Sequence, residues 1–411
     1  MKKKLYSHLN DLKNNPLYKN TFFMALSNYA NVFSGFIFWI IATRLYSIED
    51  VGTATALISS TLIVISLSRL GFDFSLIRFN TIYDKTKVFN TAIAVTTIAS
   101  LIIGIIYISR INILSSNLLQ NQRYGYMAIF LVIVILDSLI SITGTAFKAF
   151  RKADYFFFQN LITALRVPFL IPLAFLGSFG IFSSLGVAFL FSAIFSLIYL
   201  NKSVKFNFKI DKQFIKESFS FSFENYVSSI FTTIPGLILP ILVLSLSGEA
   251  ETAKYYIAFS VGSLVTIIPD ALCASLFIEG SHGENLRKNV LKVALAIYSF
   301  LIPSIIFIYF FGDYLLLFFG ENYVDALPLL KLLTLSSLFS SVVPIFVSIQ
   351  NVRMRVKPVV IMNFSMFLLL IGLSYLFILR FGIIGVGYAW IITYGILDLL
   401  IIILIRKLGW I

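Results

Sequence analysis

Residues 89–108 read FNTAIAVTTIASLIIGIIYI, a stretch without a single charged side chain. An α-helix rises ~1.5 Å per residue, so about 20 residues cross the ~30 Å hydrocarbon core of a bilayer. Comparable stretches recur along the chain: 59% of its 411 residues are apolar, only 12% are charged, and the mean hydropathy is +0.93. This composition excludes a soluble globular protein and predicts an all-α polytopic membrane protein.

Apolar stretches of at least about 18 residues predict twelve spanning helices. They lie at 21–42, 51–70, 89–108, 126–146, 159–176, 181–200, 218–246, 255–277, 290–311, 324–349, 359–379 and 383–405. No hydrophilic segment between two of these spans exceeds about 20 residues. The chain therefore has no room for a soluble catalytic or nucleic-acid-binding domain, and it is expected to act within the membrane.

Lysine and arginine are unevenly distributed over the connecting segments. Alternate segments hold 23 on one side and 5 on the other. The rich set is 1–20, 71–88, 147–158, 201–217, 278–289, 350–358 and 406–411. Cytoplasmic loops carry the excess of Lys and Arg, so both termini are expected in the cytoplasm of a multi-pass plasma-membrane protein. The net charge of +13 then follows from topology, and no nucleic-acid partner is expected.

An internal repeat appears when the chain is shifted by about 200 residues. Phe-Gly-Ile at 179–181 recurs at 381–383, and Asn28-Tyr29 recurs as Asn225-Tyr226. Six spans per half is an even number, so two six-helix lobes would be related by a pseudo-two-fold axis along the membrane normal. Chance similarity among apolar residues is the alternative. The expected organisation is a basic N-terminal segment 1–20, an N-lobe 21–200, an inter-lobe loop 201–217, a C-lobe 218–405 and a C-terminus 406–411.

Enzymatic and cofactor chemistry find little support. A single cysteine, Cys273, excludes an internal disulfide, and two distant histidines, His8 and His282, do not form a zinc motif. The sequence also lacks the Gly-x-x-x-x-Gly-Lys-Ser/Thr loop that cradles nucleotide phosphates. We therefore expect no cofactor, no metal and no ATP hydrolysis by this chain.

Four stretches, in this order along the chain, carry a family resemblance: ATRLYSIEDVG at 42–52, LGFDFSLIR at 70–78, FFGENYVDA at 318–326 and GIIGVGYA at 382–389. They resemble the polysaccharide transporter family, the lipid-linked oligosaccharide flippases of the multidrug and toxin extrusion superfamily. The resemblance implies twelve helices in two lobes around a central cavity lined partly by spans one and seven. It further implies that a lipid-pyrophosphate-linked oligosaccharide is flipped from the cytoplasmic to the outer leaflet by alternating access, with a proton or sodium ion as possible coupling ion.

Charges within the spans are the first candidate site residues, because an ionisable group at mid-membrane costs ~2.5–3.5 kcal/mol on insertion scales. Arg166 and Asp137 lie near the middle of spans five and four, where they could face a cavity or pair with each other. Lys331 and Asp398 could form a second pair or titrate during coupling. Glu224 lies near a cytoplasmic helix end, where reaching the headgroups costs little.

Substrate contacts follow from the implied pyrophosphate. Its oxygens suit the planar fork of arginine, which favours Arg166 and then Arg69, although Arg69 also lies near a cytoplasmic helix end. Asn28 and Asn225 could donate to sugar or phosphate, or bond neighbouring helices instead. Tyr29 and Tyr226 beside them could stack on sugar rings. The prolines Pro235 and Pro240 in the long span seven are the expected gate, since proline bends a helix and frees carbonyls.

Two other functions compete with the flippase. A drug or cation exporter of the same superfamily would need a carboxylate-rich cavity, which Asp137, Glu224 and Asp398 permit. A membrane-embedded sugar polymerase would need a sizeable outer loop or an acidic motif, and the outer segment 109–124 holds no acid. A transporter rather than an enzyme is therefore expected, with membrane lipids and the lipid-linked oligosaccharide as its partners.

Overall fold

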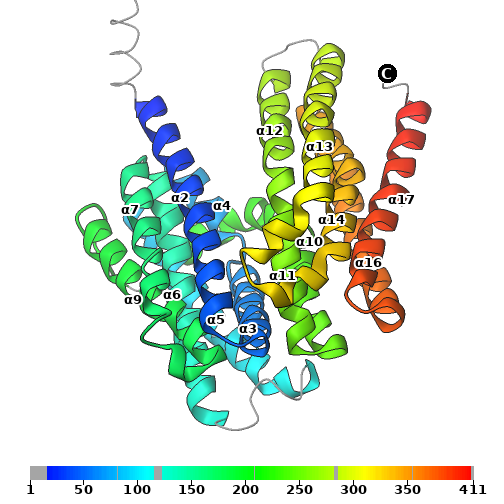
Figure 1. The fold of residues 1–411 in the computed structure, drawn as a ribbon. Helices are drawn as coiled ribbons and strands as arrows, with labels where there is room; N and C mark the ends of the chain where they lie inside the picture. The colour runs from blue at the N-terminus through cyan, green and yellow to red at the C-terminus, as the bar shows by residue number, and fades with distance from the viewer. Residues whose placement is uncertain are drawn as a thin grey trace, which may run out of the picture. The chain divides into compact units, whose positions relative to one another are not determined.

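The structure, a computed structural model, describes residues 16–80, 82–114, 123–207, 209–281, 286–353 and 355–408, and within them the chain forms helices and no strand. The α-helices are α2 (Pro16–Leu45), α3 (Ile48–Ser68), α4 (Phe72–Phe79), α5 (Lys85–Leu114), α6 (Arg123–Ala149), α7 (Ala153–Thr163), α8 (Arg166–Phe169), α9 (Ser178–Asn201), α10 (Lys212–Ser247), α11 (Glu249–Ser263), α12 (Ile267–Ser281), α13 (Leu286–Leu317), α14 (Leu327–Ser340), α15 (Val342–Val352), α16 (Val356–Phe381) and α17 (Ile384–Leu408) (Figure 1). Three 3₁₀ helices join them: η1 (Ala174–Leu176), η2 (Leu264–Thr266) and η3 (Glu321–Ala326). The predicted all-α class is confirmed.

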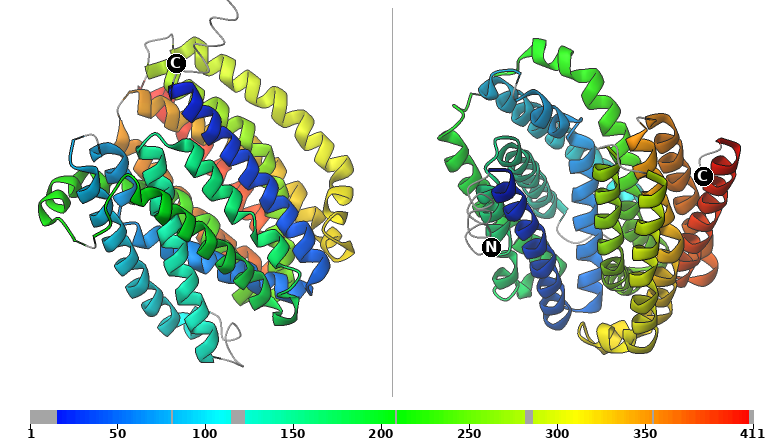
Figure 2. Two further views of the ribbon diagram at one scale, coloured as in Figure 1. Left: turned by 90° about the vertical axis from the view of Figure 1, so that its left-hand side faces the viewer. Right: turned by 90° about the horizontal axis from the view of Figure 1, so that it is seen from above.

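The helices form two compact units. The first contains the described residues up to Tyr46 together with Ser60–Ile230, and the second contains Ser47–Ser59 and the described residues from Phe231 onward. In the first unit, α2 packs along α7, and α6 packs between α5 and α9 (Figure 2). In the second unit, α17 packs against α14 and α16, and α12 packs against α13 and α15.

Eleven helical segments of the described chain are long and apolar enough to cross a membrane. The prediction of one helix at 159–176 is wrong, because this region is divided into α7, α8 and η1. The predicted loop 147–158 is also much shorter than expected, since α6 ends at Ala149 and α7 begins at Ala153. Most of the predicted N-terminal segment 1–20 lies outside the described residues.

Prolines explain where the apolar spans are interrupted. Pro168 is the third residue of α8, Pro269 the third of α12 and Pro344 the third of α15. Proline fits the first turn of a helix, where its missing N–H costs nothing. Further along a helix, it lacks the N–H of one backbone hydrogen bond and its ring crowds the preceding turn, which disfavours a continuous helix. The spans predicted at 255–277 and 324–349 accordingly contain two successive α-helices each, together with the 3₁₀ helices η2 and η3. Pro235 and Pro240, in contrast, lie inside an uninterrupted α10.

Two glycine hairpins give the internal repeat its structural basis. Gly177 precedes α9 with φ 57° and ψ −137°, and Gly382 precedes α17 with φ 59° and ψ −148°. A Cβ on Gly180 would lie 2.1 Å from the carbonyl oxygen of Leu173, and one on Gly385 would lie 2.4 Å from the backbone of Phe377. Gly177 therefore corresponds to Gly382, whereas the sequence comparison matched Gly180 to Gly382.

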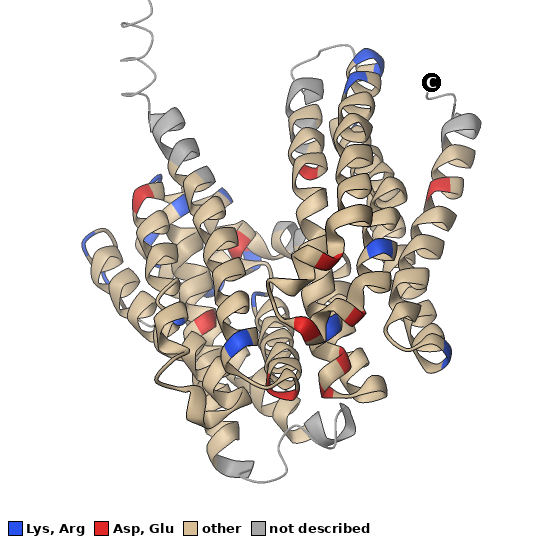
Figure 3. Cartoon of the chain, viewed as in Figure 1, with Lys and Arg blue, Asp and Glu red and all other residues tan. Residues whose placement is uncertain are grey.

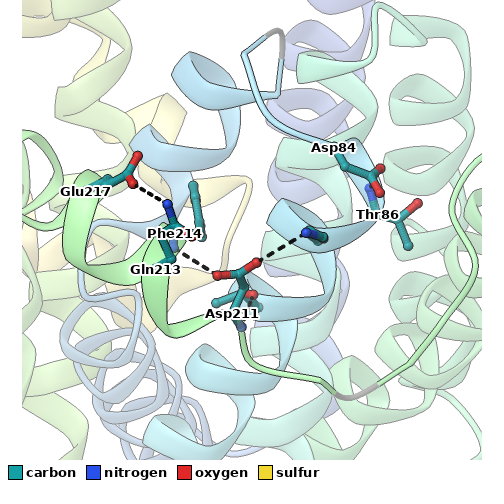
Figure 4. Close-up of polar contacts among 8 residues, drawn as sticks. Asp84, Thr86, Asp211, Gln213, Phe214 and Glu217 are labelled. Atoms are coloured by element: carbon teal, nitrogen blue, oxygen red, sulfur yellow. Dashed lines mark hydrogen bonds and ion pairs between the residues drawn. The ribbon is translucent and has the colours of Figure 1, made fainter.

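Hydrogen bonds join the segment that precedes α10 to α5. Asn90 donates from Nδ2 to the carbonyl of Lys205 at 2.9 Å and accepts from the amide of Asn207 at 3.1 Å. Asp211 donates its amide to Thr91 Oγ1 at 2.9 Å, and its carboxylate caps α10 by accepting from the amide of Phe214 at 3.0 Å (Figure 4). Because α10 begins at Lys212, the last six residues of the predicted loop 201–217 are helical.

The hairpin before α17 yields a stability prediction. Gly385→Ala places a methyl group against the backbone of Phe377, which cannot move away as a flexible side chain could, and we expect a loss of about 1–3 kcal/mol. Gly372→Ala is the matched control, because nothing lies within 4 Å of its added Cβ. The melting temperature of the detergent-solubilised protein should fall for the first variant and not for the second. Equal melting temperatures would contradict the close approach.

Candidate functional site

Arg166 lies where the fifth span is interrupted. Helix α7 ends at Thr163, Ala164 and Leu165 form a turn, and α8 begins at Arg166 itself. The amide of Val167 donates to the carbonyl of Ala164 at 3.0 Å, which closes the turn. Pro168, two residues later, lacks the N–H that a continuous helix would use there, and the break and the charge coincide.

Helix α2 supplies the surroundings of this guanidinium. Arg166 Nη2 donates to Ser34 Oγ at 3.3 Å, and Arg166 Cζ lies 5.4 Å from the centroid of the Phe38 ring. A Cβ on Gly35 would be 3.4 Å from Nη2, so this glycine gives the guanidinium room. Ser34 and Phe38 are four residues apart and share one face of the helix. A cation–π contact of this kind is worth about 0.5–2 kcal/mol.

A second hydrogen bond joins the same face of α2 to α7. Asn160 Nδ2 donates to Ser27 Oγ at 2.5 Å, and Ser27 is fully buried. Ser27 precedes Ser34 by seven residues, or about two helical turns, so both hydroxyls face α7 and α8. From the other side, Gln159 Nε2 donates to the carbonyl of Ile140 on α6 at 2.6 Å. Polar side chains at helix interfaces thus fix the broken span in place.

A second group of charges surrounds the end of α3. Arg69 Nη1 lies 3.9 Å from Asp73 Oδ2, and the charge of Arg69 also acts on Asp137 and Lys148. Burial raises the pKa of the Asp73 carboxyl, and the neighbouring Arg69 guanidinium only partly opposes this shift. The charge of Arg69 thus acts on the Asp137 carboxyl, whereas the sequence left open whether Asp137 faces a cavity or pairs with Arg166.

A tight turn places Arg69 in this group. Leu70 and Gly71 both have positive φ, 46° and 79°, and connect α3 to α4. A Cβ on Gly71 would lie 2.3 Å from the carbonyl oxygen of Ser222, so α10 passes directly over the turn. Ser75 Oγ and Ser222 Oγ share a hydrogen bond, and the Tyr226 hydroxyl donates to the carbonyl of Leu67 at 2.7 Å. The stretch 70–78, which carries part of the family resemblance, thus forms this turn and most of α4.

The predicted sugar-contacting residues lie in different environments. Asn28 is exposed on α2, and Tyr29 beside it is 70% exposed. Tyr226 is only 9% exposed, and its hydroxyl is engaged by Leu67, so the two tyrosines are not equivalent in their surroundings. Glu224 and Asn225 belong to α10, but their side chains lie outside the described part of the structure.

The predicted pair of Lys331 and Asp398 does not form among the described residues. Lys331 Nζ instead lies 4.2 Å from the centroid of the Tyr309 ring. Asp398 lies on α17, where its charge and that of Asp270 both act on Tyr394. Pro235 and Pro240 are buried within α10, which continues through both.

Sequence reasoning missed the residues that hold Arg166. Ser27, Ser34, Phe38 and Asn160 sit in apolar stretches and carry no charge, so they drew no attention. The seven-residue spacing of the two serines in span one was the signal that could have found them.

Comparison with known proteins agrees with this architecture. A family model described as polysaccharide biosynthesis protein matches residues 17–277. The chain belongs to this family. No curated protein sequence matches the chain.

Several solved structures have the same fold as this chain at low sequence identity. The lipid II flippase MurJ in an inward closed conformation has a TM-score of 0.76 at 15% identity, covering 94% of this chain and 87% of MurJ. An inward-facing multidrug resistance MATE transporter of the MOP superfamily has a TM-score of 0.71 at 14% identity over 92% of both chains. A MOP superfamily transporter from Pyrococcus furiosus has a TM-score of 0.63 at 14% identity over 95% of both chains. The chain shares its fold with these membrane transporters.

The charge group at the end of α3 is tested by a double-mutant cycle. Asp137→Asn and Arg69→Gln should be coupled by about 0.5–3 kcal/mol in the free energy of unfolding, because each removes the charge that acts on the other. Asp137→Asn and Arg166→Gln form the matched control cycle and should add to within about 0.5 kcal/mol. Unfolding in mixed SDS micelles gives both values. Coupling confined to the second cycle would restore the pairing expected from the sequence.

Proposed function

We propose that this chain flips a lipid-pyrophosphate-linked oligosaccharide from the cytoplasmic to the outer leaflet for polysaccharide or glycan export, by alternating access. Membership of the polysaccharide biosynthesis protein family and the transporter fold support the general assignment. The observation that carries the specific proposal is the placement of Arg166 at a break in a membrane span, against the polar face of α2.

The chemistry of this arrangement suits a phosphate. An arginine fork can donate to two phosphate oxygens at once, and it does so most strongly where water is scarce. Ser34 and the Phe38 ring are neutral groups, so they orient the guanidinium without supplying a negative charge. Interrupted spans often form the binding sites of transporters for anionic groups, because irregular backbone within a membrane is tolerated only where it is buried in protein or lines a water-filled cavity.

We propose further roles for the other predicted residues besides Arg166. Asn28 and Tyr29 are exposed on α2, six and five residues before Ser34. Asn28 would contact sugar hydroxyls, and Tyr29 would stack on ring faces. Asn225 would act in the same way from α10, and Pro235 and Pro240 would allow that helix to bend during access changes. Arg69 would meet the pyrophosphate at the membrane surface.

Export of a drug or organic cation is the second candidate function. Asp270 and Asp398 both act on Tyr394, which gives the second unit two carboxylates in one neighbourhood. Such a cluster would suit a cation better than a pyrophosphate. Coupling by a proton or sodium ion through Asp398 is compatible with either substrate.

We propose that the chain resides in the plasma membrane with both termini cytoplasmic. The support is the 23 to 5 distribution of Lys and Arg over alternate segments. Labelling of terminal tags by membrane-impermeant reagents in intact cells would reveal the opposite orientation.

The proposed role of Arg166 is tested in cells that depend on this chain for glycan export. Arg166→Ala should abolish surface glycan while the amount of inserted protein is unchanged, and Arg166→Lys should restore only part of it because the fork is lost. Ser34→Ala should cause a smaller loss, since it removes one orienting hydroxyl. Arg380→Ala, a change at the last turn of α16, is the control and should export normally. Full export by an inserted Arg166→Ala protein would contradict the proposal.

A further inference from the structure

The second unit contains a cavity whose lining includes none of the residues proposed to contact the substrate. Its volume is about 380 Å³, and it lies between α13, α15 and α17. Apolar side chains line most of it, among them Val290, Ala294, Ile345 and Ile349. Two arginines, Arg287 and Arg353, are the charged groups on its wall.

Both arginines lie at one end of the cavity. Arg287 is the second residue of α13, and Arg353 directly follows the last residue of α15. From Arg287 the lining continues to Ala294, about 10 Å along α13, and from Arg353 it continues back to Val342, about 16 Å along α15. The cavity therefore has a cationic head and an apolar body of roughly two to three helical turns.

The floor of the cavity is packed, whereas one of its walls is exposed. Phe346 and Ile401 are each 2% exposed and belong to a packed cluster that includes Leu397. Leu291, on the opposite wall, is 63% exposed. A preformed apolar slot that opens along a membrane helix suits a hydrocarbon chain entering from the side.

Additional positive charge gathers around the head of the cavity. Lys288 and Lys292 follow Arg287 on α13, and Figure 3 shows the basic residues at this end of the helix. Arg355 and Lys357 follow Arg353 between α15 and the first turn of α16. Basic pockets between spanning helices and clusters of Lys and Arg beside them attract anionic lipid headgroups.

We infer that this cavity binds one molecule of an anionic phospholipid from the surrounding leaflet. Its phosphate would be held by Arg287 and Arg353, and one acyl chain would occupy the apolar body between α13 and α15. Charge complementarity selects the anionic headgroup, and the length of the apolar lining selects a chain rather than a free phosphate. Among the described residues, the lining offers no amide or hydroxyl row for an oligosaccharide.

The test uses the full chain in phosphatidylcholine vesicles that contain a small fraction of photoactivatable phosphatidylglycerol with a diazirine on its acyl chain. Cross-linked peptides mapped by mass spectrometry should come from α13, α15 and α17, several-fold more than with the matching phosphatidylcholine probe. Arg287→Gln combined with Arg353→Gln should reduce this labelling to the phosphatidylcholine level. Arg380→Gln, which alters the single arginine of a different apolar cavity beside α16, should leave it unchanged.

Further arms separate the possible occupants. Ala294→Phe, which fills the apolar body, should remove the labelling even though both arginines remain, and millimolar glycerol phosphate should not compete. Equal labelling by the two probes, or labelling unaffected by the double arginine change, would overturn the inference. Displacement of phosphatidylglycerol by a polyprenyl phosphate at a tenfold lower concentration would also overturn it, because the cavity would then serve the transported lipid. Arg166 variants should label normally, which keeps this result distinct from failure of the proposed function.

Discussion

The interruption of the fifth span by Pro168 is the constraint on which the candidate site depends. A continuous helix through 159–176 would satisfy its own backbone and present Arg166 as an isolated charge in an apolar region. The proline instead ends α7 at Thr163 and makes Arg166 the first residue of a new short helix. The guanidinium then reaches Ser34 and Phe38 on α2, which link the break to the first span.

Prolines also interrupt spans in the second unit. Pro269 and Pro344 begin α12 and α15 in the same way, and polar side chains satisfy part of the backbone at these junctions. Thr266, for example, donates to the carbonyl of Ser263 at 2.9 Å, and Ser341 donates to that of Leu338 at 3.2 Å. Irregular backbone within a membrane survives where such partners are available. The short helix α15 that results forms one wall of the cavity with Arg353 at its head.

The sequence was sufficient for the fold class, because uncharged stretches such as 89–108 have few alternatives to a spanning helix. It did not reveal the breaks, since hydropathy is the same for one long helix and for two short ones. The prolines held the missing signal, but only position distinguishes Pro168, at the start of a helix, from Pro235, inside one. The repeat was recognised with a shift of a few residues, because similar apolar neighbours hide which glycine makes the hairpin.

The sequence does not reveal which charged side chains within the spans interact with one another. Asp137 and Arg166 lie at matching depths in neighbouring spans, which made them the natural pair. The turn at Leu70 and Gly71 instead directs the end of α3 so that Arg69 acts on Asp137. That turn depends on α10 crossing Gly71, a contact between residues about 150 positions apart. Tertiary contacts of this range leave no local pattern in the sequence.

We propose that this chain alone moves a lipid-linked pyrophosphate oligosaccharide, and that the membrane potential rather than a nucleotide acts on its charge. Each elementary charge that crosses ~100 mV gains ~2.3 kcal/mol, so an anion is drawn toward the positive side. The decisive measurement is translocation of such a lipid in vesicles that contain the purified chain and no ATP, with an imposed potential of either sign. We expect translocation without ATP that changes in rate with the sign of the potential and is lost in Arg166→Ala. A requirement for ATP, or transport of a cationic dye with no movement of the lipid-linked sugar, would contradict it.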